Sequence, residues 1–203
     1  SSGMQMVKDL ARAADEGKFP EDVHFLVRYR PEDYTDAETV LRHSFNHPRV
    51  TITKPASRSF KDSNGRPDFE FTYDDLYVME HSLRYSTACI NAISTFTIDS
   101  AALDVPIINI RYDPDPKTPP PYRIGIFSHY DHYLMLERTG GVRLVYSGEE
   151  LIDALNGYLE DPSLDKEGRS KIRNDQIEFT DGESGVRTAK AILAFLEKAG
   201  KTA

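Results

Sequence analysis

The chain of 203 residues carries 33 acidic and 25 basic side chains, for a net charge of −8, and its mean hydropathy is −0.52. This acidic balance argues against non-specific nucleic-acid binding, and no apolar run approaches the about 20 residues of a membrane-spanning helix. The length and a hydrophobic content of 39% predict one domain with one core. The single cysteine, Cys89, excludes an internal disulfide and a cysteine-based zinc cluster, is most simply a small buried hydrophobe, and favours a cytoplasmic protein.

Patterns along the chain predict helices that alternate with short strands. Apolar residues at helical spacing indicate the helices, and brief runs of β-branched and aromatic residues indicate the strands. Ser147 followed by Glu150 is a capping box that starts the helix over 149–159. In chain order we expect a helix over 6–14, a strand over 23–27, a short helix over 37–45, a strand over 50–53, a helix over 74–84, a strand over 87–92, a helix over 97–103, strands over 106–110 and 142–145, and helices over 149–159 and 184–203.

Two longer stretches are predicted as loops. Residues 54–73 turn polar and carry Gly, Ser and Asn, so we expect a polar loop there. Residues 111–138 include the sequence DPDPKTPPP at 113–121, whose prolines exclude a helix or a central strand, and continue as an aromatic-rich segment. Both loops belong to a single predicted domain that spans 1–203.

The predicted strands are continuous apolar runs, which is typical of a parallel sheet covered by helices on both faces. We therefore predict an α/β, Rossmann-like fold. Ligands of such folds bind beyond the carboxyl ends of the strands, at the point where the strand order reverses. The loops at 28–36, 94–99 and 111–124 leave strands on that side, so we expect them to converge on one site.

The segment CINAISTFTIDSAALDVPIINI at 89–110 is the most informative part of the chain. It reads as an apolar strand, a hydroxyl-rich turn, a small-residue helix and a second apolar strand. A helix that begins just past a strand presents backbone N–H groups and a positive dipole end, which together bind phosphate. This context favours a nucleotide or nucleotide-sugar site, although such a turn serves equally well as an ordinary helix cap. The polar side chains of the turn are Ser94, Thr95, Thr97 and Asp99.

Several short motifs follow one another from residue 87 to residue 196. They are S-T-x-x-x-D at 94–99, a proline and an apolar strand at 105–110, s-x-E-E-L-x-x-A at 147–154, Asp161-Pro162, and Asp181-Gly182 with Arg187 and Ile192. This order resembles the C-terminal, donor-binding half of GT-B glycosyltransferases, nearest to the bacterial surface-carbohydrate and CDP-glycerol glycerophosphotransferase-like group. The resemblance covers somewhat more than half of the chain and rests on the order of the motifs.

The resemblance implies a domain that binds a nucleotide donor, a nucleotide-sugar or a CDP-polyol, from which a sugar or polyol-phosphate group moves to an acceptor. It implies no other cofactor. Such transferases often carry His-Pro after the first strand, where this chain reads Arg-Tyr-Arg-Pro; a guanidinium is a bidentate phosphate partner. The expected donor and phosphate contacts are Ser94, Thr95, Thr97, Asp99, Arg28 and Arg30.

The aromatic-rich segment is expected to stack on a base or sugar through Tyr122 and Tyr130, or simply to pack. His129, Asp131 and His132 are too few ligands for a zinc site, so we expect no metal. A complete GT-B enzyme needs a first domain that carries the acceptor site and often the general base. We therefore name no catalytic residue, and expect that domain to be the partner and to provide any peripheral membrane association.

Two alternatives from other classes stay open. One is a non-catalytic module that binds a nucleotide or a protein through the Pro-rich and aromatic residues of 119–133. The other is a small doubly wound enzyme of another kind, such as an epimerase-like or phosphate-transferring protein. The sequence contains neither G-x-x-x-x-G-K nor G-x-G-x-x-G, which counts against ATPase and dinucleotide-binding roles.

Overall fold

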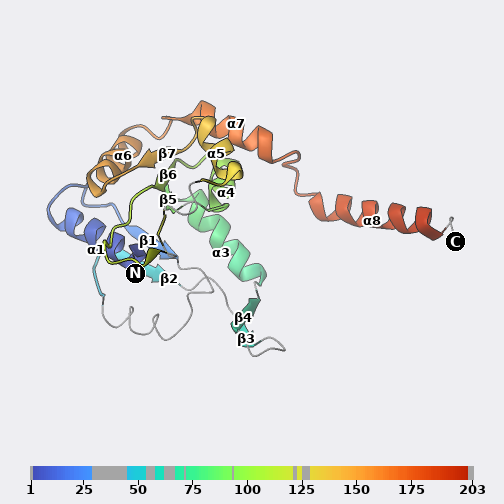
Figure 1. Cartoon of the computed structure of the whole chain (residues 1–203), viewed down its shortest axis with the longest axis horizontal. Coiled ribbons are helices and arrows are strands. Elements are labelled where there is room, and N and C mark those ends of the chain that lie inside the picture. The colour runs from blue at the N-terminus through green and yellow to red at the C-terminus, as the bar shows by residue number, and fades with distance from the viewer. Residues whose placement is uncertain are drawn as a thin grey trace.

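The computed structural model of the chain describes residues 2–28, 45–53, 58–61, 67–70, 72–92, 94–120, 123–124 and 129–200. The helix expected over 37–45 lies almost wholly outside these residues. The described part contains two small parallel sheets, one antiparallel strand pair and the helices around them (Figure 1).

A three-stranded parallel sheet forms the centre of the molecule. Its strands are, in spatial order, β5 (Cys89–Asn91), β6 (Ile107–Ile110) and β7 (Arg143–Val145). The register pairs Ile90 with Ile108, and Asn109 with Leu144. All four residues of the middle strand β6 are buried, as expected for a parallel strand covered on both faces.

Helices cover both faces of this sheet. Alternate residues of β6 point to opposite faces, so they belong to two different core clusters. One core cluster joins Ile108 and Ile110 to Leu10 of α1 (Ser2–Asp15) and to Leu151 and Tyr158 of α6 (Gly148–Glu160). The other joins Ile107 to Ala101 of α4 (Phe96–Ala102), Leu136 of α5 (Asp131–Arg138) and Ile172 of α7 (Lys166–Gln176). The predicted α/β, Rossmann-like class is confirmed.

A second parallel pair consists of β1 (Phe25–Arg28) and β2 (Val50–Thr53), with Phe25 opposite Val50. Phe25 and Ile90 of β5 pack against the same core cluster, on the side of α1. The strands form two small sheets over a shared core rather than the single sheet that we expected.

Helix α3 (Tyr73–Arg84) begins with a capping box in which Thr72 and Asp75 bond to each other's backbone N–H groups. Leu83 of α3 packs against Cys89 and Val105, and these three residues form a small third core cluster. Cys89 is a free and buried thiol, and burial raises its pKa. The expectation that it is a small buried hydrophobe is confirmed.

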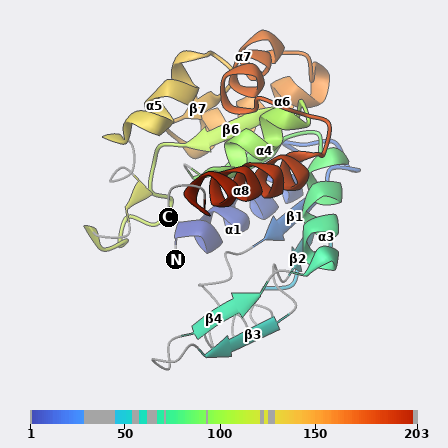
Figure 2. The ribbon, with the colours of Figure 1, turned by 90° about the vertical axis from the view of Figure 1, so that its right-hand side faces the viewer.

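Four elements lie where no helix or strand was expected. The predicted polar loop 54–73 contains an antiparallel pair, β3 (Arg58–Lys61) and β4 (Pro67–Glu70), away from the central sheet (Figure 2). The predicted loop 111–138 ends in helix α5, and helix α7 was not predicted at all. Short polar strands and a charged helix carry little hydrophobic periodicity, and the Asn-Gly pair between β3 and β4 was the overlooked hairpin signal.

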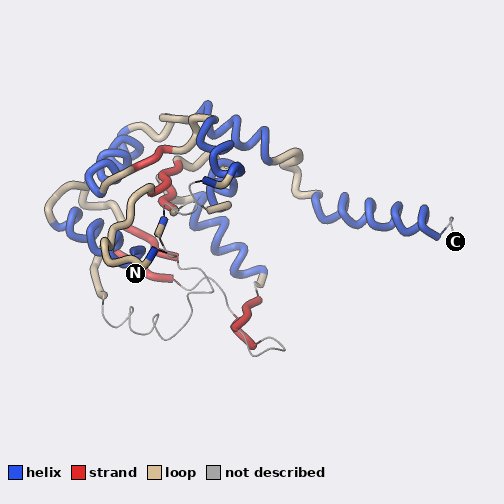
Figure 3. The backbone as a smooth tube through the Cα atoms, viewed as in Figure 1, coloured by secondary structure: helices blue, strands red, loops and turns tan. Residues whose placement is uncertain are grey.

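The last helix, α8 (Ser184–Gly200), projects away from the body of the molecule (Figure 3). It has no buried residue. Its start at Ser184 agrees with the predicted C-terminal helix.

Candidate functional site

The carboxyl edge of the central sheet is where ligands bind in folds of this class. Strands β5, β6 and β7 are parallel, so the segments that follow them leave at the same edge. These segments are the turn at 94–99, the loop that begins with Arg111, and Tyr146 ahead of α6. The structure therefore brings two of the three expected loops to one edge.

Thr97 ties helix α4 to the ends of two strands. Its side chain has no exposed surface, and its Oγ1 lies 3.4 Å from Oδ1 of both Asn91 and Asn109. The single hydroxyl proton serves one of these amide oxygens at a time. Thr97 is thus a positioning residue in this conformation, and its hydroxyl offers no surface to a ligand.

The turn at 94–99 satisfies three of its own backbone amides. The N–H of Phe96 donates to Oγ of Ser94 (3.2 Å), that of Thr97 to the Ser94 carbonyl (3.0 Å), and that of Ile98 to the Thr95 carbonyl (2.8 Å). A phosphate at this turn must therefore use side chains more than these amides. Thr95 is exposed at the N-cap position and its side chain makes no capping bond.

Asp99 lies in the first turn of α4 and is exposed. Partial desolvation still raises the pKa of its carboxyl group above the ordinary value. With Thr95 it gives the turn one hydroxyl and one carboxylate on the surface of the molecule. These groups suit hydrogen bonds to the hydroxyls of a ribose or sugar.

Arg111 is the residue at this edge that the sequence-based analysis missed. It follows the last residue of β6, and only 6% of its side chain is exposed. One guanidinium nitrogen pairs with Oε1 of Glu137 of α5, whose side chain is 14% exposed. Nη1 of Arg111 and Oε1 of Glu137 are both buried and have no hydrogen-bond partner among the described residues. Burial lowers the pKa of Arg111. A buried donor without an acceptor costs about 1–3 kcal/mol, and an anionic ligand would remove that cost.

The remaining predicted contacts are distributed as follows. Arg28 ends β1, in the two-stranded sheet. Tyr130 precedes α5, is 48% exposed, and stacks on His132 with ring centroids 5.7 Å apart. Arg30 and Tyr122 lie outside the described residues. No group of three His, Cys, Asp or Glu side chains within the described ranges is placed to hold a metal ion.

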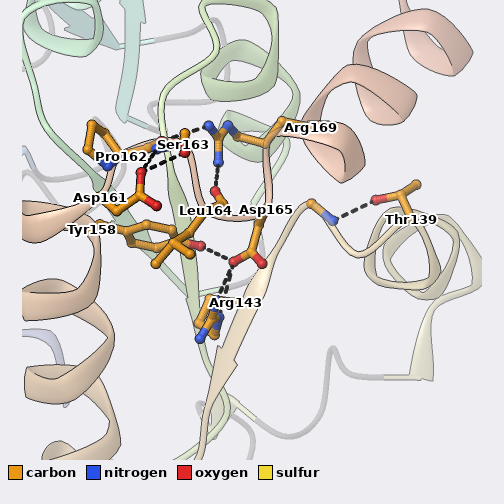
Figure 4. Close-up of polar contacts among 10 residues, drawn as sticks. Thr139, Arg143, Tyr158, Asp161, Pro162, Ser163, Leu164, Asp165 and Arg169 are labelled. Carbon is orange, nitrogen blue, oxygen red and sulfur yellow. Dashed lines mark hydrogen bonds and ion pairs between the residues drawn. The ribbon is translucent and has the colours of Figure 1, made fainter.

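A second polar cluster lies at the opposite, amino edge of the sheet (Figure 4). Oδ2 of Asp165 accepts hydrogen bonds from Nη2 of Arg143 (2.7 Å) and from the hydroxyl of Tyr158 (2.6 Å). Arg169 is 1% exposed and donates to Asp104 (2.9 Å) and to the Pro162 carbonyl (3.0 Å). Its partners all belong to the chain, which indicates a structural role.

Comparison with known proteins finds no matching family model, curated protein or solved structure. Within the part of the chain that the structure describes, no helix is long and apolar enough to cross a bilayer.

Proposed function

We propose that the chain is the donor-binding domain of a cytoplasmic transferase of the glycosyltransferase type. It binds a nucleotide donor with the diphosphate at the carboxyl edge of β5–β7, while a sugar or polyol-phosphate group moves to an acceptor. The observation that carries the proposal is Arg111: a buried guanidinium at the end of the middle strand, with one nitrogen that has no acceptor among the described residues.

The charge of the chain makes a local cation necessary. With a net charge of −8, the molecule as a whole repels an anionic ligand, so binding depends on groups at the site. Arg111 supplies a positive charge in a desolvated position, where electrostatic interactions are stronger than in water. Glu137 neutralises part of that charge, and the diphosphate would share the guanidinium with it through Nη1.

The chemistry assigned to this edge is electrostatic. Arg111 would stabilise the leaving nucleoside diphosphate as negative charge develops on it in the transition state, without a covalent intermediate. Thr95 and Asp99 would bind hydroxyl groups of the donor. The general base that deprotonates the acceptor is assigned to a second domain, so this chain alone should bind nucleotide and turn nothing over.

A thermal-shift screen tests this proposal. The purified chain is heated with UDP, CDP or GDP, and with the corresponding sugar and glycerol derivatives. A ligand that binds only the native state raises the apparent stability by mass action, so one nucleotide family should raise the melting temperature. The Thr95→Ala, Asp99→Ala variant should lose most of that rise.

The matched control is a Thr87→Ala, Asp153→Ala variant. Both residues are exposed, and they lie before β5 and on α6, away from the proposed site. This variant should keep the full shift. The absence of stabilisation by every nucleotide at millimolar concentration would contradict the proposal and favour a non-catalytic module that binds a protein.

A further inference from the structure

Glu137 binds the same guanidinium that the proposed phosphate site uses. The carboxylate of Glu137 pairs with one nitrogen of Arg111, and the two side chains are 14% and 6% exposed. A guanidinium binds carboxylates and phosphates through the same N–H donors. An anionic ligand of Arg111 therefore meets a group of the chain itself that has matching chemistry.

The backbone that carries Glu137 is held in place. Leu136, the residue before it, is buried in the core. Just past α5, Oγ1 of Thr139 donates to the Leu136 carbonyl (2.6 Å) and accepts from the N–H of Gly141 (3.1 Å). The carboxylate of Glu137 can therefore leave Arg111 through rotation of its own side chain, whereas a movement of this end of α5 would break these contacts.

The pair differs from the buried arginine at the opposite edge of the sheet. Arg169 donates to Asp104 and to two backbone carbonyls, so all three of its side-chain nitrogens have acceptors (Figure 4). Nη1 of Arg111 and Oε1 of Glu137 are buried without hydrogen-bond partners among the described residues. Such atoms cost free energy, so the Arg111–Glu137 pair stabilises the fold less well than the Arg169 network does.

Arg111 lies next to an exposed part of the sheet edge. The register pairs Ile110 of β6 with Val145 of β7, and the N–H of Arg111 donates to the Val145 carbonyl (2.8 Å). The following positions on the two strands therefore place Tyr146 beside Arg111. Tyr146 is 61% exposed. The ion pair is thus covered by few atoms on the side of Tyr146, where an anion can approach from solvent.

The charge of the pair favours ligands that carry several negative charges. Arg111 and Glu137 together have no net charge, and the whole chain carries −8. A carboxylate ligand on Nη1 would gain hydrogen bonds to a guanidinium but would lie against the like charge of Glu137. A diphosphate can bind Arg111 through one phosphate group while the other binds the turn at 94–99, so its additional contacts offset the repulsion.

We infer that Glu137 determines the specificity of this edge: its carboxylate competes for Arg111, excludes carboxylate ligands and admits diphosphates. The inference rests on the proposed function, which places a diphosphate at Arg111. It implies that Glu137 lowers the affinity for the diphosphate, because only part of the Arg111 population is free to bind it. Affinity is thereby exchanged for discrimination against the wrong anion.

Calorimetric titration of the full chain with inorganic pyrophosphate tests this inference. Glu137→Gln keeps the shape and an acceptor oxygen but removes the charge, so it should bind pyrophosphate at least about tenfold more tightly than the wild type. Glu137→Asp keeps the charge on a shorter side chain and should have an intermediate affinity. Acetate in place of chloride, at equal ionic strength, should weaken pyrophosphate binding by Glu137→Gln and leave that of the wild type unchanged.

Asp104→Asn is the matched control. It also removes one carboxylate from a buried arginine, Arg169, but at the opposite edge of the sheet. This variant should bind pyrophosphate as the wild type does, although its stability should fall. Circular dichroism shows whether each variant is folded, and Glu137→Asp decides the test if Glu137→Gln does not fold.

Two results would overturn the inference. One is a pyrophosphate affinity that does not rise in the folded Glu137 variants, and the other is an equal rise in Asp104→Asn, which would assign the effect to overall charge. The proposed function fails separately. A wild type that binds pyrophosphate but no nucleoside diphosphate would contradict the nucleotide donor, and a rise in pyrophosphate affinity in Glu137→Gln would still support Glu137 as the competitor.

Discussion

The two edges of the central sheet differ in whether their buried arginines find hydrogen-bond acceptors within the chain. At the amino edge, the buried Arg169 and the neighbouring Arg143 find acceptors within the chain, in Asp104, Asp165 and backbone carbonyls. At the carboxyl edge, the buried Arg111 pairs with Glu137 but leaves Nη1 without an acceptor among the described residues. Closed networks stabilise a fold, whereas a buried donor without an acceptor costs stability, and a bound anion is one partner that would complete it.

The amino edge also contains two residues with an unusual backbone conformation. Asp104 and Asp165 both have left-handed backbone conformations, with φ of 57° and 60°, which few non-glycine residues adopt. Each places a carboxylate against an arginine of the amino-edge network. The local strain is therefore offset by hydrogen bonds inside the protein, and the amino edge is where substitutions should affect stability most.

The largest expected effect on the free energy of unfolding comes from removing Arg169, the buried cation of the amino edge. Arg169→Ala removes three hydrogen-bonding nitrogens and leaves Asp104 without that partner, so the free energy of unfolding should fall by about 3–5 kcal/mol. Urea denaturation monitored by circular dichroism measures this change. Lys171→Ala, an exposed position on the same helix, should change it by less than about 0.5 kcal/mol. Similar values for the two variants would show that the network does not stabilise the fold.

The next largest effect is expected where two backbone segments touch. A Cβ on Gly168 of α7 would lie far inside van der Waals contact with the backbone of Gly140 and Gly141, so that one segment must move. Gly168→Ala should therefore lower the free energy of unfolding by about 1–3 kcal/mol. Gly157→Ala is the matched control, because its Cβ would lie 3.7 Å from Leu164 Cδ1 within helix α6, where alanine is the better helix former. It should leave stability unchanged or slightly higher.

Tyr158 should give the amino edge a pH dependence. Burial and the hydrogen bond to Asp165 raise the pKa of Tyr158 well above that of an unfolded tyrosine. The contribution of Tyr158 to the free energy of unfolding is therefore complete below a pH of about 10. Above that pH the contribution is lost, because the unfolded chain releases a proton that the native chain keeps. Tyr158→Phe should lower the unfolding free energy by about 1 kcal/mol at pH 7, and this deficit should shrink as the pH rises above about 10. A deficit that is constant between pH 8 and pH 11 would contradict this.

The smallest stability effect is expected at the carboxyl edge. Asp99 is exposed and its pKa is raised, so the native state favours the protonated form. The stability of the wild type should therefore rise a little relative to that of Asp99→Asn as the pH falls toward 3.8 and below. At pH 7 the variant should lie within about 0.5 kcal/mol of the wild type. The affinity of the Asp99→Asn variant for nucleotide should nevertheless fall. Urea titration measures the stability of the variant, and calorimetry on the same sample measures its affinity. A large loss of stability would assign Asp99 to the fold instead.

The sequence predicted the central sheet well because its strands are dense apolar runs. The runs at 106–110 and 142–145 match strands β6 and β7 within one residue. Helix α7 escaped because its buried positions include a glycine and an arginine, so the apolar periodicity is weak. The hydroxyl of Thr97 looked like a ligand contact because burial depends on the distant strand residue Asn109, which local spacing does not reveal.

Arg111, like Thr97, has an environment that depends on a residue distant in the sequence. Its signal was its place directly after the most apolar strand, but the pairing with Glu137 depends on helix α5, which was predicted as a loop. The edge of the sheet was therefore predictable from the sequence, whereas the side chain that carries the proposed chemistry required the packed structure.

Isothermal titration calorimetry on an Arg111→Gln, Glu137→Gln variant tests the central claim most directly. The double substitution removes both charges together, so no unpaired buried carboxylate remains to unfold the chain. The exposed pair Arg138→Gln, Glu160→Gln removes the same charges at the last residues of α5 and α6, away from the carboxyl edge. We predict that the nucleoside diphosphate selected in the thermal screen binds the wild type and the control equally, and binds the Arg111 variant at least about tenfold more weakly. Equal affinity for all three proteins, with the Arg111 variant folded, would contradict a phosphate site at the carboxyl edge.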